Sequence, residues 1–90
     1  MSFERVGVVG CGLMGSGIAE VCARAGLDVV VREADATAAE AGLRRITASL
    51  DRGVRSGKLD EAARDSALGR IRLTTDYDEL ADRQLVVEAV

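Results

Sequence analysis

The sequence predicts an α/β fold in which a parallel β-sheet is covered by helices. An apolar run over 5–9 leads directly into a glycine-rich turn, and a helical pattern begins at Leu13. A second, β-branched run follows at 28–32. Two strands separated by a helix need a crossover connection, which joins parallel neighbours. With 90 residues the chain forms one domain at most.

The glycine-rich turn reads G-C-G-L-M-G over 10–15. Gly10 permits a sharp turn, Gly12 lets a ligand approach the backbone, and Gly15 lets the helix lie close to the strand. The free N–H groups and the positive end of the helix dipole suit a pyrophosphate. Glycine-rich turns are common, so this motif alone is weak evidence for a nucleotide site.

Glu33 strengthens the nucleotide interpretation. It ends the second strand, where a dinucleotide-binding β-α-β unit places a carboxylate that binds the adenosine ribose hydroxyls. The same charge repels a 2′-phosphate and therefore favours NAD over NADP. The side chain of Arg32 should point to the opposite side of the strand. The alternative is that Glu33 is an ordinary solvated acid, but the combined pattern favours a Rossmann-like NAD-binding unit.

The remaining pattern predicts long helices over 13–25, 36–56 and 61–68, a one-turn helix over 76–80, and strands over 71–74 and 84–90. Gly26, Gly57 and Gly69 should end the three long helices. Right-handed crossovers then give the strand order 3-2-1-4. Helical spacing predicts one buried face on each of the first two helices, formed by Ile18, Val21, Cys22 and Ala25, and by Leu43, Ile46, Leu50 and Val54.

The predicted fourth strand should be central, yet the sequence stops on Val90. A doubly wound sheet needs helices on both faces. We therefore expect residues 1–90 to be the N-terminal part of a NAD-binding Rossmann domain, with the remaining sheet outside this chain.

Composition narrows the classes of function. The net charge of −3 argues against a general nucleic-acid binder. No apolar run is long enough to span a bilayer and no signal peptide is recognisable, so we expect a cytoplasmic protein without membrane attachment. The absence of histidine excludes histidine-based acid–base chemistry and histidine metal ligands within these residues, and no metal site is predicted.

The two cysteines, Cys11 and Cys22, do not form a recognisable disulfide framework. Cys11 could have a lowered thiol pKa at a helix N-terminus. The interpretation as a small residue tolerated between two glycines is favoured.

The second long helix is basic toward its end, where Arg45, Ser49, Arg52 and Ser56 form a polar row at helical spacing. Arg55 and Lys58 add further positive charge. This pattern is compatible with a solvated face or with a basic helix end that meets phosphate.

Several stretches resemble the N-terminal, NAD-binding part of 3-hydroxyacyl-CoA dehydrogenases, and the bacterial 3-hydroxybutyryl-CoA dehydrogenases most closely. They are G-C-G-L-M-G-S-G-I-A, the acid at Glu33, S-L-D-R-G-V-R-S-G-K-L and the closing D-R-Q-L-V-V-E-A-V. The resemblance covers essentially the whole chain. It implies NAD-dependent oxidation of a 3-hydroxyacyl-CoA, or the reverse reduction, in fatty acid and butanoate metabolism.

The resemblance also implies roles for individual residues. The turn residues Gly10, Cys11, Gly12, Leu13, Met14 and Gly15 would wrap the NAD pyrophosphate. Glu33 would bind the adenosine ribose, and Ala89 would approach the cofactor through its backbone. Ser49 and Lys58 would contact CoA, with Arg55 as the alternative to Lys58.

The family's catalytic histidine, its glutamate partner, its active-site serine and asparagine, and its dimer-forming helical domain would all lie beyond Val90. No catalytic residue is therefore expected here, and residues 1–90 alone should be inactive, although a homodimer is expected for the full-length protein.

Two other classes of function fit the residues. One is a non-catalytic NAD-binding module such as a redox-sensing regulatory domain. The other is a dehydrogenase of the same fold that acts on a hydroxy acid or a sugar acid. The stretch from Ser49 to Lys58 favours the acyl-CoA enzyme, because a basic helix end suits a CoA nucleotide.

Overall fold

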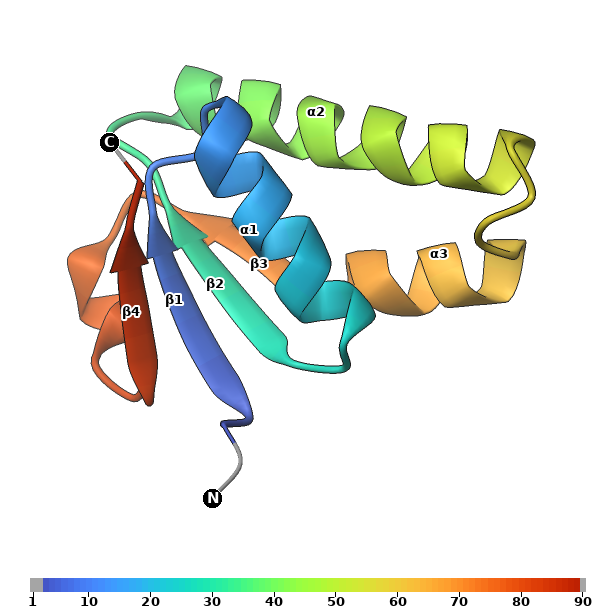
Figure 1. Cartoon of the computed structure of the whole chain (residues 1–90). Helices are drawn as coiled ribbons and strands as arrows, with labels where there is room; N and C mark the ends of the chain where they lie inside the picture. Colours follow the sequence, from blue (N-terminus) through green and yellow to red (C-terminus); the bar gives the residue numbers. More distant parts are fainter. Residues whose placement is uncertain (1–2, 90) are drawn as a thin grey trace.

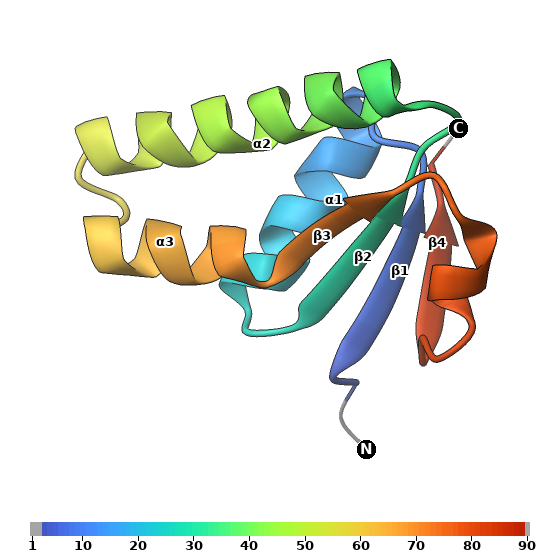
Figure 2. The same cartoon turned by 180° about the vertical axis from the view of Figure 1, so that it is seen from behind.

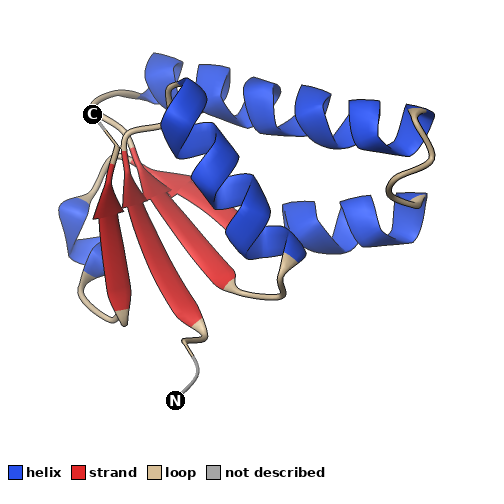
Figure 3. Ribbon diagram, viewed as in Figure 1, coloured by secondary structure: helices blue, strands red, loops and turns tan. Residues whose placement is uncertain are grey.

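The computed structural model describes residues 3–89 and confirms the predicted α/β architecture (Figures 1 and 3). The elements in chain order are β1 (Arg5–Val9), α1 (Leu13–Arg24), β2 (Asp28–Arg32), α2 (Ala36–Arg55), α3 (Glu61–Gly69), β3 (Ile71–Thr74), the 3₁₀ helix η1 (Tyr77–Leu80) and β4 (Leu85–Glu88).

The four strands form one sheet in the order β3-β2-β1-β4, as predicted. Every pair is parallel, with Val8 opposite both Val31 of β2 and Val87 of β4. The carboxyl ends of the strands therefore meet at one edge of the sheet. The starts of α1 and α2 lie at the same edge (Figure 1). In open α/β sheets, ligands bind outside this edge where the strand order reverses, which here is between β1 and β4.

The main core lies between the sheet and the helices. It is built from small aliphatic residues, among them Val6, Val8, Val29, Val31, Ala19, Ala23, Ile46, Leu50 and Ala67. Alternate residues of each strand point to this face because the side-chain period of a strand is two. The lack of large side chains brings the helices close to the strands.

The predicted buried face of α1 is partly wrong. Ile18 and Cys22 do pack against the core, but Val21 is 68% exposed and Ala25 is exposed. The buried residues are Gly15, Ser16, Ala19 and Ala23. The helix rests on the glycine turn through its smallest residues, and this contact rotates the larger Val21 toward solvent.

The predicted buried face of α2 is also shifted. Ile46 and Leu50 are fully buried and Val54 is half-buried, but Leu43 remains 42% exposed. Gly42 takes the contact position instead, because it lies directly against Cys11. A Cβ on Gly42 would be 2.4 Å from the Cys11 Sγ.

Part of the opposite face of the sheet is covered by η1, which is seen in front of β4 at the right of Figure 2. Leu80 packs there with Val9 and Val30. The missing side chain of Gly7 makes room, since a Cβ would be 2.8 Å from a methyl carbon of Leu80.

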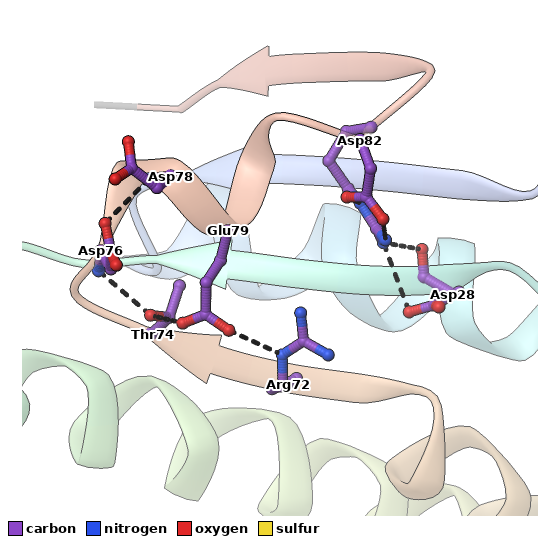
Figure 4. Close-up of polar contacts among 8 residues, drawn as sticks. Asp28, Arg72, Thr74, Asp76, Asp78, Glu79 and Asp82 are labelled. Atoms are coloured by element: carbon purple, nitrogen blue, oxygen red, sulfur yellow. Dashed lines mark hydrogen bonds and ion pairs between the residues drawn. The ribbon is translucent and has the colours of Figure 1, made fainter.

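Polar contacts fix the segment around η1 (Figure 4). Glu79 accepts a hydrogen bond from Thr74 and pairs with Arg72. The side chain of Arg83 is 3% exposed and pairs with Asp28 and Asp82. The segment before β4 is thereby anchored to β2 and β3.

The ends of the helices and of the last strand lie within a few residues of the predicted ends. Gly26 and Gly57 have positive φ and follow the ends of α1 and α2, as predicted, whereas α3 continues through Gly69 and ends one residue later than expected. β4 is shorter than the predicted 84–90, and Val90 lies outside the described residues. Leu85 and Val86 of β4 are 44% and 45% exposed.

Within the described part, no helix is both long and apolar enough to cross a membrane.

Candidate functional site

The glycine turn joins β1 to α1 at the switch point of the sheet. Gly10 adopts a φ of 98°, in the left-handed region, and its N–H donates to the Arg32 carbonyl at 2.9 Å. Gly15 sits against the same turn, where a Cβ would be 1.9 Å from the Gly10 carbonyl oxygen. The predicted reasons for glycine at these two positions are therefore confirmed.

The start of α1 differs from the other helix starts. Asp35 caps α2 by accepting from the Ala38 N–H at 2.8 Å, and Asp60 caps α3 by accepting from the Ala63 N–H at 2.7 Å. No side chain of the described residues caps α1, which begins after Gly12 and has no acidic residue in its first turn. The first N–H groups of α1 are thus available to an anion, and the first turn of the helix itself contributes no negative charge.

Cys11 is buried, and its backbone is held on both sides. Its N–H donates to Glu33 Oε2 at 2.9 Å. Its carbonyl accepts from the Ser16 hydroxyl at 3.0 Å and from Arg45 Nη1 at 2.9 Å. The peptide planes of the turn are therefore fixed by side chains from α1, α2 and the end of β2.

The Cys11 thiol faces the core. Its Sγ lies 3.4 Å from Ser16 Oγ. Burial, the largest effect, raises the pKa of the thiol above its ordinary value. The hydrogen bond with Ser16 lowers this pKa, the charge of Glu33 raises it and the charge of Arg45 lowers it, in decreasing order of size. Burial and the raised pKa both disfavour the reactive, low-pKa thiol that the helix N-terminus alone would allow. Only the backbone of Cys11 faces the expected cofactor.

Glu33 lies directly beside the turn. Its N–H continues the β-ladder by donating to the Thr74 carbonyl at 2.9 Å, and its Oε1 accepts from the Ala34 N–H at 3.2 Å. Arg32 points away, as predicted, because its guanidinium stacks 3.9 Å from the centre of the Tyr77 ring. The carboxylate at the turn is consequently not neutralised by its neighbour.

Ala89 also reaches the turn. Its N–H donates to the Val9 carbonyl at 2.8 Å, and its Cβ would be 3.5 Å from a Cβ on Gly15. In contrast, the side chains of Leu13 and Met14 project outward and are 88% and 60% exposed. All eight predicted cofactor residues therefore cluster at one edge of the sheet. Their binding roles stay predictions.

The predicted CoA residues are not brought together. Ser49, half-buried as expected for a boundary position, lines a cavity of about 280 Å³ between α1 and α2. Its other lining residues are Leu13, Ser16, Gly17, Glu20, Arg45, Ala48 and Arg52. Lys58 follows the end of α2 and, like Arg55, does not line this cavity. The cations that accompany Ser49 are Arg45 and Arg52.

Sequence reasoning missed Ser16, Gly42 and the contact of Arg45 with the turn. A glycine inside a helix with otherwise strong helix propensity was the available signal for Gly42, since such a glycine commonly marks a close approach. Nothing in the local sequence identifies Arg45 as the partner of Cys11, because the contact joins residues far apart in the chain.

The comparison with known proteins is decisive at this point. Residues 5–90 match the family described as 3-hydroxyacyl-CoA dehydrogenase, NAD binding domain. The chain belongs to this family. A Mycobacterium tuberculosis 3-hydroxybutyryl-CoA dehydrogenase is 56% identical over 89 residues, which cover 99% of the chain and 31% of that protein.

Solved structures of family members agree. The crystal structure of M. tuberculosis FadB2 superposes with a TM-score of 0.98 at 56% identity, covering 100% of the chain and 32% of that protein. The (S)-3-hydroxybutyryl-CoA dehydrogenase of Ralstonia eutropha gives a TM-score of 0.95 at 44% identity, covering 99% and 31%. The chain thus spans about a third of the length of these relatives, and it has the cofactor-domain fold that they share.

Proposed function

We propose that this chain supplies the NAD-binding part of an enzyme that oxidises a 3-hydroxyacyl-CoA to the 3-oxoacyl-CoA, or runs the reverse reduction. The observation that carries the proposal is the uncapped start of α1 beside the Glu33 carboxylate, in a chain of this family. The family assignment favours this function over a regulatory NAD module or a hydroxy-acid dehydrogenase.

The residues at the turn fit a dinucleotide. The N–H groups at the start of α1 would hold the pyrophosphate, and Glu33 would accept hydrogen bonds from the adenosine ribose. Ala89 would border the cofactor through its backbone. NAD, when bound, supplies the acceptor for the hydride that leaves the substrate's C3 carbon. The contribution of this chain is to bind and orient the cofactor.

The cavity at Ser49 supports a CoA contact. A hydroxyl and two guanidinium groups, from Arg45 and Arg52, line it together. Arginine binds phosphate through several donors at once. Ser49 therefore stays a proposed CoA ligand, and Arg52 joins it as a second one. Lys58, with Arg55 as its alternative, stays a proposed ligand outside the cavity, where α2 ends.

The chemical step needs a general base, and this chain has no histidine to provide one. In this proposal the base and the remainder of the doubly wound domain, with a helical C-terminal domain, are supplied outside residues 1–90. Further properties of the whole protein stay predictions. They are a homodimer, a cytoplasmic location, the absence of nucleic-acid and membrane partners, and a role in butanoate metabolism. Light scattering of the intact protein tests the dimer.

The proposed activity is tested by incubating the intact protein with 3-hydroxybutyryl-CoA and NAD and following NADH formation. We expect turnover that requires both substrates and depends on chain length when longer 3-hydroxyacyl-CoA thioesters are compared. Absence of NADH formation with every thioester, in a folded protein that binds NAD, would refute the acyl-CoA activity but not the cofactor assignment.

A further inference from the structure

Arg45 contacts the glycine turn and also lines the cavity between α1 and α2. Its Nη1 donates to the Cys11 carbonyl of the glycine turn at 2.9 Å, and its side chain also lines the cavity that contains Ser49 and Arg52. Ser16 likewise lines the cavity and donates to the same carbonyl at 3.0 Å. The wall between the turn and the cavity therefore consists of side chains that bind the turn.

The bond to Cys11 sets the direction of a donor at the turn. The carbonyl of Cys11 and the N–H of Gly12 belong to one planar trans peptide, so they point in opposite directions. Arg45 of α2 and Ser16 of α1 hold the carbonyl on the side where these two helices meet the turn. The Gly12 N–H is consequently directed away from these two side chains.

The guanidinium of Arg45 has donors left for the cavity. It carries five N–H donors in a rigid fork, and the bond to Cys11 uses one of them. An anion in the cavity would bind the remaining donors and restrict the side chain in the orientation that holds the turn. Two arginines, Arg45 and Arg52, and one acidic residue, Glu20, line the cavity. The lining therefore carries a net positive charge and favours an anionic ligand.

We propose that Arg45 is a positioning residue that couples the cavity to the glycine turn, so that a phosphate-bearing ligand bound beside Ser49 tightens NAD binding. This inference rests on the proposed function, because it takes the turn as the NAD site and CoA as the ligand of the cavity. By linkage, NAD tightens binding in the cavity by the same factor.

The test measures the dissociation constant of NAD for the intact protein by calorimetry, with and without saturating coenzyme A. The variants are Arg45→Met, which keeps the length but removes all donors, and Arg45→Lys, which restores one charged donor. Arg44→Met is the matched control, since Arg44 is the exposed neighbour on α2 and the hydrogen bonds and ion pairs of residues 3–89 do not include it.

The expected result is that coenzyme A lowers the Kd for NAD at least twofold in the wild type and in Arg44→Met, and leaves it unchanged in Arg45→Met. The Kd without coenzyme A should rise about fivefold in Arg45→Met. Arg45→Lys should recover most of the lost NAD affinity, because one donor suffices for Cys11. The effect of coenzyme A on the Kd for NAD should stay absent in this variant. A residue with a merely structural role would change the melting temperature without changing the coupling factor.

The inference is overturned if Arg45→Met binds NAD like the wild type, or if coenzyme A affects NAD binding equally in both. A wild-type protein that does not bind NAD would refute the proposed function itself, and this inference with it. A wild type that binds NAD but shows no effect of coenzyme A would refute the coupling alone.

Discussion

A Cβ on Gly15 would lie 1.9 Å from the carbonyl oxygen of Gly10. The atom it would meet is backbone, so no side-chain rotation can relieve the clash. Contact between these two glycines sets how closely α1 approaches β1, and with it the position of the uncapped helix start at the switch point of the sheet.

Gly15→Ala is accordingly expected to lower the free energy of unfolding by about 1–3 kcal/mol and to weaken NAD binding, because α1 must move away from the turn. Urea unfolding and NAD titration check both effects. Gly17→Ala is the matched control in the same helix. A Cβ on Gly17 meets nothing within 4 Å, and alanine should stabilise the helix by up to about 1 kcal/mol. Equal stability of Gly15→Ala and the wild type would contradict the packing argument.

The buried Cys11 thiol predicts a pH dependence. Burial raises its pKa in the folded state, so the unfolded chain loses this proton first as the pH rises. The stability it contributes is present below the ordinary thiol pKa of about 8.5 and is lost progressively above it. The stability advantage of the wild type over Cys11→Ala should therefore shrink as the pH rises above about 8.5.

Urea midpoints of the two proteins across this range provide the measurement. Cys22, whose pKa burial also raises, is present in both and does not affect the comparison. A constant difference would show that the thiol does not titrate differently in the folded and unfolded states.

The cavity between α1 and α2 predicts which cations meet CoA. Ser49→Ala and Arg52→Met should each raise the KM for 3-hydroxybutyryl-CoA several-fold and leave NAD affinity nearly unchanged. Lys58→Ala should raise it less than Arg52→Met, because Lys58 does not line the cavity. The effects of the two cations should shrink with added salt. Wild-type KM values for Ser49→Ala and Arg52→Met would remove the cavity from the substrate site.

Much of this picture follows from local sequence. The β-α-β unit, the strand order and Glu33 beside the turn are all readable, because strand and helix periods, glycine positions and right-handed crossovers are local or topological rules. The faces of α1 and α2 were less predictable. Their orientation depends on where Gly15 and Gly42 touch the turn, and hydrophobic periodicity gives glycine no weight.

The identity of the cation at the CoA cavity was likewise not predictable from the local sequence. Helical spacing placed Ser49 with Arg45 and Arg52 in one polar row, but a family resemblance pointed to Lys58. Which member of the row faces α1 is decided by the crossing of two helices, and the sequence of either helix alone does not contain that information.

A purified chain of residues 1–90 should form no NADH from 3-hydroxybutyryl-CoA, because no histidine is available as general base. Circular dichroism of the same sample provides the control that the chain is folded. Turnover above the uncatalysed rate by this chain would contradict the assignment of the base to another part of the protein.

The central claim, that the glycine turn and Glu33 form an NAD site, is tested most directly by calorimetric titration of the intact protein with NAD and NADP. NAD should bind at least about tenfold more tightly, a difference of roughly 1.4 kcal/mol, because the 2′-phosphate of NADP meets the Glu33 carboxylate. Glu33→Gln keeps an acceptor for the Cys11 N–H but removes the charge, so it should narrow the preference while the turn stays intact. Equal affinity of the wild type for NAD and NADP, or an unchanged preference in Glu33→Gln, would contradict the account.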